Sequence, residues 1–166
     1  EISRRERGVM ISVNEGEGSS DGKGKFSEDV DHFFSDSGQL SESADFAYRP
    51  QQQEMAVAVA EALEGESVLS VEAGTGVGKS LAYLIPAVQF ALDKGKKAVI
   101  STHTINLQEQ LIGKDLPIVK KLIKRDFDAV LLKGRGNYIC PARLRRAMEK
   151  PRDLFTSSET EELRAI

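Results

Sequence analysis

Residues 73–80 constrain the fold of this chain more than any other segment. They read Ala-Gly-Thr-Gly-Val-Gly-Lys-Ser, after a short apolar run at 67–72 and before an apolar-periodic run at about 79–93. The glycines let backbone N–H groups turn inward and approach an anion with no Cβ in the way. The N-terminus of a following helix favours the same negative charge. A strand, a Gly-rich turn ending in Lys-Ser and a helix, in that order, predict a phosphate-binding loop.

This loop predicts a site for ATP and Mg²⁺. Lys79 is the predicted catalytic residue because its charge would face the β- and γ-phosphates, and the Ser80 hydroxyl is a predicted Mg²⁺ ligand. The first position of the motif is usually Gly and is Ala here. A Gly-rich turn that binds nothing would not require Lys-Ser and a helix to follow in order. The predicted nucleotide-binding residues of the loop are Ala73, Gly74, Thr75, Gly76, Val77, Gly78, Lys79 and Ser80.

Length and composition indicate a single globular domain. The chain has 166 residues, of which 40% are hydrophobic and 30% charged. No apolar run approaches the roughly 20 residues of a membrane span, and no basic-then-apolar leader opens the sequence. One cysteine excludes an internal disulfide framework. We therefore expect a soluble cytoplasmic protein without a membrane partner.

Apolar periodicity predicts strands that alternate with helices. Such alternation is typical of an α/β fold, with a parallel sheet covered by helices on both faces. Gly113 is expected to stop one of the helices, and the Ser158/Glu161 spacing predicts a last helix starting near Ser158. The predicted strands are 67–72, 97–101 and 127–132, and the predicted helices are about 50–63, 79–93, 104–112 and 116–124.

Charge is distributed unevenly along the chain. Residues 1–47 carry 11 acidic and 5 basic side chains, a net charge of −6, whereas residues 114–152 carry 12 basic and 4 acidic side chains, a net charge of +8. A local basic zone is typical of a polyanion partner, but scattered Lys and Arg on a solvated face would give the same pattern. Charge alone leaves both interpretations open.

Three further segments carry a family resemblance. Residues 48–52 read Tyr-Arg-Pro-Gln-Gln, residues 101–111 read Ser-Thr-His-Thr-Ile-Asn-Leu-Gln-Glu-Gln-Leu, and residues 133–141 read Lys-Gly-Arg-Gly-Asn-Tyr-Ile-Cys-Pro. Together with 71–80, and in this order and spacing, they resemble the start of a DinG/XPD-type helicase of superfamily two. The resemblance runs from about Phe33 to the end of the chain. It implies a P-loop NTPase (RecA-like) parallel sheet with flanking helices.

The resemblance also implies roles for matching residues. Arg49 and Gln52 correspond to the adenine-reading segment, where a Gln amide can pair with both edges of the base. Thr102, Thr104 and Gln108 fall in the element that grips the DNA backbone, with single-stranded or forked DNA as the implied partner. On residue type alone, Gln52 could equally be a solvated helix residue and 102–110 an ordinary capped amphipathic helix. His103 is assigned no role.

Cys140 has two interpretations. In many relatives a cysteine in this Gly-Arg-x-Asn-Tyr-x-Cys context is the first of four thiolate ligands of a [4Fe–4S] cluster. One thiolate cannot hold such a cluster, and this chain has no other cysteine. The alternative is a small packing residue.

The resemblance further implies an incomplete motor domain. ATP hydrolysis needs an acidic pair, and no Asp-Glu-x-His segment follows the loop in this sequence. The chain also begins at Glu rather than Met, so we expect the N-terminal part of a longer helicase. The expected organisation is a flexible acidic segment at 1–25, a partly ordered lead-in at 26–47, motor domain at 48–133, and an iron–sulfur or DNA-binding insertion beginning at 134–166.

Two other functions are compatible with the loop itself. One is a different P-loop phosphotransferase, such as a small-molecule kinase, against which the segments at 48–52 and 102–110 argue. The other is a nucleotide-dependent DNA-binding module without catalysis.

Overall fold

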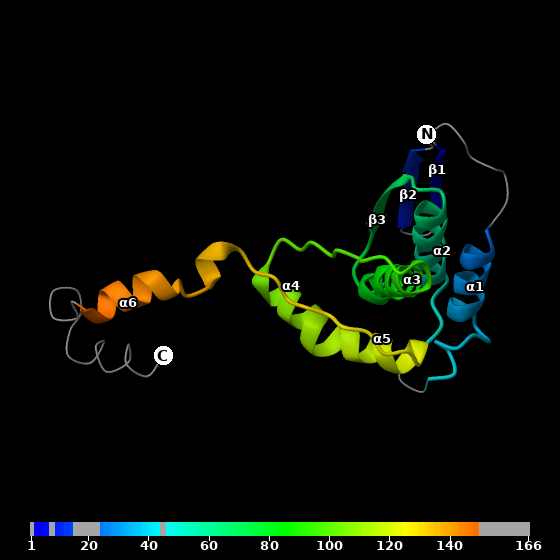
Figure 1. The fold of residues 1–166 in the computed structure, drawn as a ribbon. Helices are drawn as coiled ribbons and strands as arrows, with labels where there is room; N and C mark the ends of the chain where they lie inside the picture. The colour runs from blue at the N-terminus through cyan, green and yellow to red at the C-terminus, as the bar shows by residue number, and fades with distance from the viewer. Residues whose placement is uncertain (1, 7–8, 15–23, 44–45, 150–166) are drawn as a thin grey trace. The chain divides into compact units, whose positions relative to one another are not determined.

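The computed structural model describes residues 2–6, 9–14, 24–43 and 46–149. The chain divides into two compact units, residues 1–130 and residues 131–166. Among the described helices, none combines the length and the apolar composition that crossing a bilayer requires. In chain order the elements are β1 (Ile2–Glu6), β2 (Val9–Asn14), α1 (Lys25–Phe34), α2 (Pro50–Glu64), β3 (Val68–Ala73), α3 (Lys79–Lys94), α4 (Ile105–Gln110), η1 (Leu111–Asp115), α5 (Leu116–Ile123), η2 (Arg135–Asn137) and α6 (Pro141–Glu149) (Figure 1).

Helix α2 lies at the centre of the first unit. It contacts α1, α3 and β3, and its buried side chains are mostly small: Met55, Ala56, Val57, Ala58, Ala60 and Ala62. Alanine lets neighbouring backbones approach closely and has the highest helix propensity, so one sequence pattern serves both packing and helix formation. Pro50 occupies the first turn, where its missing N–H costs nothing. The predicted helices at 50–63 and 79–93 are confirmed as α2 and α3.

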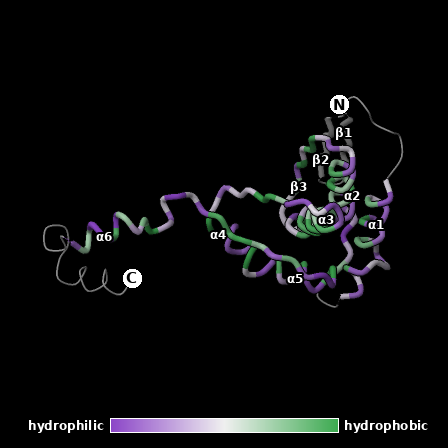
Figure 2. The backbone as a smooth tube through the Cα atoms, viewed as in Figure 1, coloured by the Kyte–Doolittle hydropathy of each residue, from purple (hydrophilic) through white to green (hydrophobic). Residues whose placement is uncertain are grey.

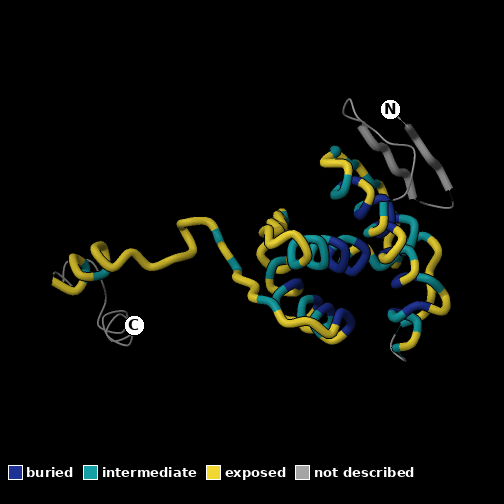
Figure 3. The backbone as a smooth tube through the Cα atoms, turned by 45° about the vertical axis from the view of Figure 1, so that its right-hand side comes forward, coloured by how far each residue is buried: buried dark blue, intermediate teal, exposed yellow. Residues whose placement is uncertain are grey.

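Helix α1 packs antiparallel to α2 and completes this core. Val30, Phe33, Phe34 and Leu40 are buried in the same cluster as Leu84 and Ile85 of α3. In Figure 3 the dark-blue, buried residues occur in the first unit, whereas the described residues of the second unit are teal or yellow. The apolar side chains of the lead-in, 26–47, therefore belong to the main core.

The Glu64 side chain caps the start of α1. Its two carboxylate oxygens accept hydrogen bonds from the backbone N–H groups of Phe26, at 3.2 Å, and Ser27, at 3.1 Å. The first N–H groups of a helix have no partner within the helix, and negative charge is favoured at that end. The last residue of α2 thus fixes the first turn of α1.

The sheet differs from the predicted one. Strand β3 corresponds to the predicted strand at 67–72, but it pairs with β2, and β2 pairs with β1, both in antiparallel register. The prediction of a parallel sheet is therefore wrong for the sheet that this structure contains. Only one face of β3 is covered, because Leu69, Val71 and Ala73 pack inward while the alternate residues are exposed. β1 and β2 lie within the segment 1–25 that was expected to be flexible, whereas its Gly-rich part, 15–23, lies outside the described residues.

The other two predicted strands are not formed. The structure describes 97–101 and 127–132 without regular secondary structure, although both are apolar (Figure 2). A strand is stabilised by the hydrogen-bond ladder to a neighbour, and the described strands pair only among themselves. Val99 and Val130 are accordingly 89% and 86% exposed.

The helical region after Thr104 is longer than predicted. Gly113 was expected to end a helix, but α4 continues through the π-helical turn η1 into α5. Leu111, Val119 and Leu122 are buried along this run. Their burial keeps the chain helical past the glycine, which costs only about 1 kcal/mol inside a helix. The helix predicted near Ser158 lies outside the described residues.

The Glu64 cap gives a stability prediction. Glu64→Ala removes both acceptors at the start of α1, and we expect the free energy of unfolding to fall by about 1–2 kcal/mol. Denaturant unfolding followed by circular dichroism measures the change. Glu61→Ala, an exposed acid one turn earlier on the same helix, is the matched control. Equal losses for the two variants would contradict the capping role.

Candidate nucleotide-binding site

The predicted phosphate loop connects the end of β3 to the start of α3. Gly76 has a φ of 82° and Gly78 a φ of 85°, in the left-handed region that side chains with a Cβ rarely adopt. Both positions favour glycine because of this left-handed backbone conformation. Gly78 is also the residue directly before α3. The loop therefore has the strand–turn–helix context that the sequence predicted.

Lys79 folds back over the loop. Its Nζ donates to the carbonyl oxygens of Ala73 and Gly74, each at 2.9 Å. The ammonium group is thus held at the loop by two neutral acceptors, while the side chain stays exposed. A phosphate oxygen, which carries negative charge, is a stronger acceptor for an ammonium than a carbonyl is. The geometry suits exchange of these carbonyls for an anionic ligand.

Arg49 and Gln52 lie beside the loop, although they precede it by about 25 residues. The Gln52 Nε2 atom donates to the carbonyl oxygen of Gly78 at 2.9 Å, and Gln52 is only 2% exposed. A Cβ added at Gly78 would collide with the Gln52 amide and come within 3.4 Å of an Arg49 guanidinium nitrogen. The structure thus brings the segment at 49–52 and the phosphate loop into one site.

Ser80 lies in the first turn of α3 next to Tyr83. Burial raises the pKa of Tyr83 above its ordinary value, a hydrogen bond with the Ser80 side chain acts in the opposite direction, and nearby Asp115 adds to the rise. Asp115 is 6% exposed and accepts a hydrogen bond from Gln110 Nε2 at 3.3 Å. Sequence reasoning missed Tyr83 and Asp115. The one sequence signal for Asp115 was its position as an acidic residue within an otherwise apolar helical segment.

The predicted DNA-contacting residues surround the start of α4. The Thr104 hydroxyl accepts a hydrogen bond from Leu107 N–H at 3.3 Å, and the Thr102 hydroxyl donates to the Thr104 carbonyl at 3.1 Å. Both hydroxyls therefore shape the helix start. Gln108 lies one turn further along the same helix and is partly exposed.

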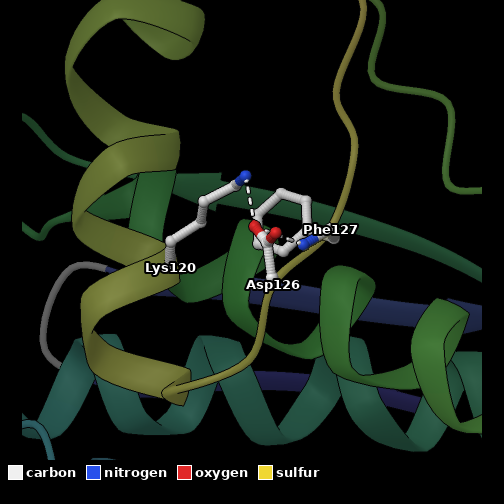
Figure 4. Close-up of polar contacts among 3 residues, drawn as sticks. All are labelled: Lys120, Asp126 and Phe127. Carbon is white, nitrogen blue, oxygen red and sulfur yellow. Dashed lines mark hydrogen bonds and ion pairs between the residues drawn. The ribbon is translucent and has the colours of Figure 1, made fainter.

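Two cations of the predicted basic zone are paired with acids. Lys120 Nζ lies 2.7 Å from Asp126 Oδ1 and 5.0 Å from the centre of the Phe127 ring. Figure 4 shows the Lys120–Asp126 contact beside Phe127. The same carboxylate oxygen accepts from Phe127 N–H at 3.0 Å. Arg125 pairs with Asp93 at the end of α3. The net charge of +8 already includes Asp126, whereas Asp93 lies outside residues 114–152, so of these two pairs only that of Arg125 lowers the local charge below that count.

The second unit contains a short turn and one exposed helix. Tyr138 OH accepts from Lys133 N–H at 2.8 Å, which closes the turn around η2. Cys140 is exposed just before α6. Hydrogen bonds from the backbone N–H groups of Arg143 and then Ala142 lower the pKa of its thiol below the ordinary value.

The residues of this chain do not complete an iron–sulfur site. Four thiolates hold a [4Fe–4S] cluster, and the sequence contains a single cysteine. Across the described ranges, no group of three or more His, Cys, Asp or Glu side chains is placed to hold a metal ion. The Ser80 hydroxyl is the Mg²⁺ ligand that the motif predicts.

Comparison with protein families assigns the chain to a known class. The family model of the DEAD/DEAH box helicases matches residues 49–135, just over half of the chain. The chain belongs to the DEAD/DEAH box helicase family. Membership implies a P-loop, RecA-like fold, and the matched region includes β3, the phosphate loop and α3.

Individual relatives agree with this placement. The ATP-dependent DNA helicase YoaA of Haemophilus influenzae is 47% identical over 116 residues, which are 69% of this chain and 18% of that protein. The ATP-dependent DNA helicase DinG of Escherichia coli K12 is 45% identical over 102 residues, 60% of this chain and 14% of that protein. The chain thus spans less than a fifth of the length of these relatives, and it is similar to the DinG-type helicases that the sequence analysis named.

The Lys120–Asp126 pair gives a prediction on pH. The hydrogen bond from Lys120, then its charge, then Phe127 N–H lower the pKa of Asp126 in the folded chain. The stabilisation is therefore present above the pKa of the unfolded chain and is lost as pH falls through the lower, folded value. We expect Lys120→Met to raise the Asp126 midpoint toward its ordinary value in an NMR titration. Lys121→Met, at the exposed neighbouring position, should leave the midpoint in place, and an unmoved midpoint in Lys120→Met would refute the pairing.

Proposed function

We propose that this chain is the N-terminal part of an ATP-dependent DNA helicase and binds Mg²⁺–ATP through the phosphate loop. The observation that carries the proposal is the convergence of Gln52 and Arg49 on Gly78 of that loop. A Gly-rich turn with no ligand would not need a buried amide and a guanidinium beside it. The family match and the names of the relatives, which are ATP-dependent DNA helicases, support the same function.

Nucleotide binding would use the loop in three ways. The backbone N–H groups from Gly74 to Gly78 would surround the β-phosphate, as the left-handed glycines allow. Lys79 would exchange the carbonyls of Ala73 and Gly74 for phosphate oxygens. Ser80 would provide a hydroxyl oxygen to Mg²⁺. Thr75 and Val77 complete the loop, and Val77 also packs against Ala58 of α2.

Adenine recognition is proposed for Arg49 and Gln52. The Nε2 atom of Gln52 is engaged with Gly78, so a base would meet this amide from its carbonyl side or take over the contact. Gln52 thus links base recognition to the position of the phosphate loop. A change at Gln52 tests both functions at once.

DNA contact is proposed for Thr102, Thr104 and Gln108. Hydroxyl and amide side chains are common ligands of phosphate and sugar oxygens, and they bind the backbone without reading sequence. The three side chains lie around the start of one helix in the same unit as the phosphate loop. Single-stranded or forked DNA is the proposed substrate.

Hydrolysis and unwinding are proposed for the longer protein that carries this chain. The acidic pair that holds Mg²⁺ and orients water is not found after the loop in this sequence. The proposed organisation keeps 48–133 as motor domain and 134–166 as the start of an insertion. In that longer protein Cys140 is proposed as one of four cluster thiolates, and the other three must come from outside this chain.

A first prediction concerns Lys79. Lys79→Ala removes the charge that faces the β- and γ-phosphates, so DNA-stimulated ATP hydrolysis by the full-length helicase should fall to background. The exposed Lys79 contributes nothing to the core, so the thermal unfolding midpoint should not change. Lys97→Ala, another exposed lysine, should keep normal hydrolysis. Hydrolysis near the normal rate in Lys79→Ala would rule out the phosphate-loop assignment.

A second prediction concerns Gln52. If Gln52 reads adenine, Gln52→Ala should weaken ATP binding much more than GTP binding, because a lost buried hydrogen bond costs about 1–3 kcal/mol. Competition between each nucleotide and a fluorescent ADP analogue measures the two affinities in the same sample. Equal losses for ATP and GTP would show that Gln52 serves only the phosphate loop.

A further inference from the structure

A hydrogen-bonded network joins the end of α1 to the first turn of α2. The Gln53 Nε2 atom donates to the backbone carbonyl of Asp31 at 3.0 Å and to its Oδ1 atom at 2.7 Å. The Gln53 Oε1 atom accepts from Tyr48 OH at 2.8 Å. The amide orientation follows from chemistry, since only nitrogen can donate to Asp31 and only oxygen can accept from the hydroxyl in this arrangement. Gln53 is therefore fixed on both of its polar atoms.

The neighbouring residue extends this network toward the phosphate loop. Successive residues of a helix leave its axis about 100° apart, so Gln52 and Gln53 leave the same turn in different directions. Gln53 contacts α1, whereas Gln52 contacts the Gly78 carbonyl in the loop. The first turn of α2 is thus held between α1 and the nucleotide site.

Helix α1 is itself held at both ends. Glu64 binds its first N–H groups, and Gln53 binds the Asp31 carbonyl in its last turn. Along the helix, Val30, Phe33 and Phe34 are buried in the core shared with α2 and α3. A displacement of α1 along α2 would break contacts at both ends and in the core, so α1 provides a firm reference for the first turn of α2.

The position of Asp31 is not explained by helix stability. A carboxylate in the last turn of a helix lies at the negative end of the macrodipole, where it is unfavourable. Asp31 is also only partly exposed. The contact with Gln53 offsets this cost and directs the Gln53 amide. The contact therefore stabilises the first turn of α2, which also carries Gln52 of the proposed adenine segment.

We propose that α1 is part of the nucleotide site, with Asp31 and Gln53 as positioning residues that fix the turn carrying Arg49 and Gln52. The family match begins at residue 49, so this assigns a role to a helix that precedes the matched region. The inference rests on the proposed binding of ATP. Asp31 and Gln53 act through Gln52, which contacts the loop.

The test compares variants of Asp31 in the full-length helicase. Asp31→Ala removes the carboxylate acceptor, and we expect KM for ATP to rise about threefold to tenfold, the equivalent of one hydrogen bond, with kcat unchanged. Asp31→Asn keeps an oxygen that can accept from Gln53 and should restore most of the affinity. Asp29→Ala, an exposed acid on the same helix, is the matched control and should behave as the unmodified protein.

A second readout separates positioning from folding. The thermal unfolding midpoint of Asp31→Ala should stay within about 2 °C of the unmodified protein, because removal of an acid from the negative end of a helix offsets the lost contact. Tyr48→Phe removes only the hydroxyl that orients Gln53, and it should raise KM for ATP in the same direction by a smaller factor. This variant keeps the test valid if Asp31→Ala does not fold.

Three results would overturn the proposal. Unchanged KM for ATP in Asp31→Ala and Tyr48→Phe, with activity abolished in Lys79→Ala, would leave the nucleotide site in place and remove α1 from it. A fall in unfolding midpoint that accounts for the rise in KM, without rescue by Asp31→Asn, would reduce Asp31 to a packing residue. Normal activity in Lys79→Ala would remove the proposed function and this inference with it.

Discussion

The close packing of α2 against its neighbours is the constraint on which the first unit depends. Four of its buried residues are alanines, so α1, α3 and β3 can all approach its backbone. Its first turn reaches the phosphate loop through Gln52 and its last residue caps α1 through Glu64. Replacement of one of these alanines by a larger side chain would separate the layers, and overpacking of this kind typically costs about 1–3 kcal/mol. The nucleotide site and the core therefore share one structural element.

The phosphate loop combines a specific backbone geometry with an exposed charged side chain. Gly76 and Gly78 hold left-handed conformations, and Gly78 is contacted by Gln52. Lys79, in contrast, is exposed and donates hydrogen bonds to two loop carbonyls. A rigid loop keeps its N–H groups directed at one place, which lowers the ordering cost of binding an anion. The exposed ammonium group of Lys79 is the charge that would meet the ligand.

The sequence predicted the local elements of this site better than their surroundings. The phosphate loop, α2 and α3 follow from glycine spacing, from Pro50 at a helix start and from apolar periodicity, all of which act over a few residues. The prediction of a parallel sheet was wrong because strand pairing depends on which segments meet in the folded chain. Residues 97–101 and 127–132 pair with none of the described strands. The predicted helix end at Gly113 was wrong because the burial of Leu111 and Val119 outweighs the low helix propensity of glycine. Residues 51–53 are three consecutive glutamines, so residue type alone does not indicate which of them contacts the loop. The direction in which each side chain leaves the helix decides this.

The uncovered apolar segments have a consequence for handling the protein. Val99, Val130 and Leu132 expose most of their surface to water, and Leu132 is 79% exposed. Exposed apolar side chains are a liability for aggregation when they are not covered by a partner. The 166-residue chain produced by itself should therefore accumulate in inclusion bodies or as soluble aggregates at the concentrations used for crystallisation. Charged substitutions at Val99 and Val130 would be the first choice for keeping it in solution.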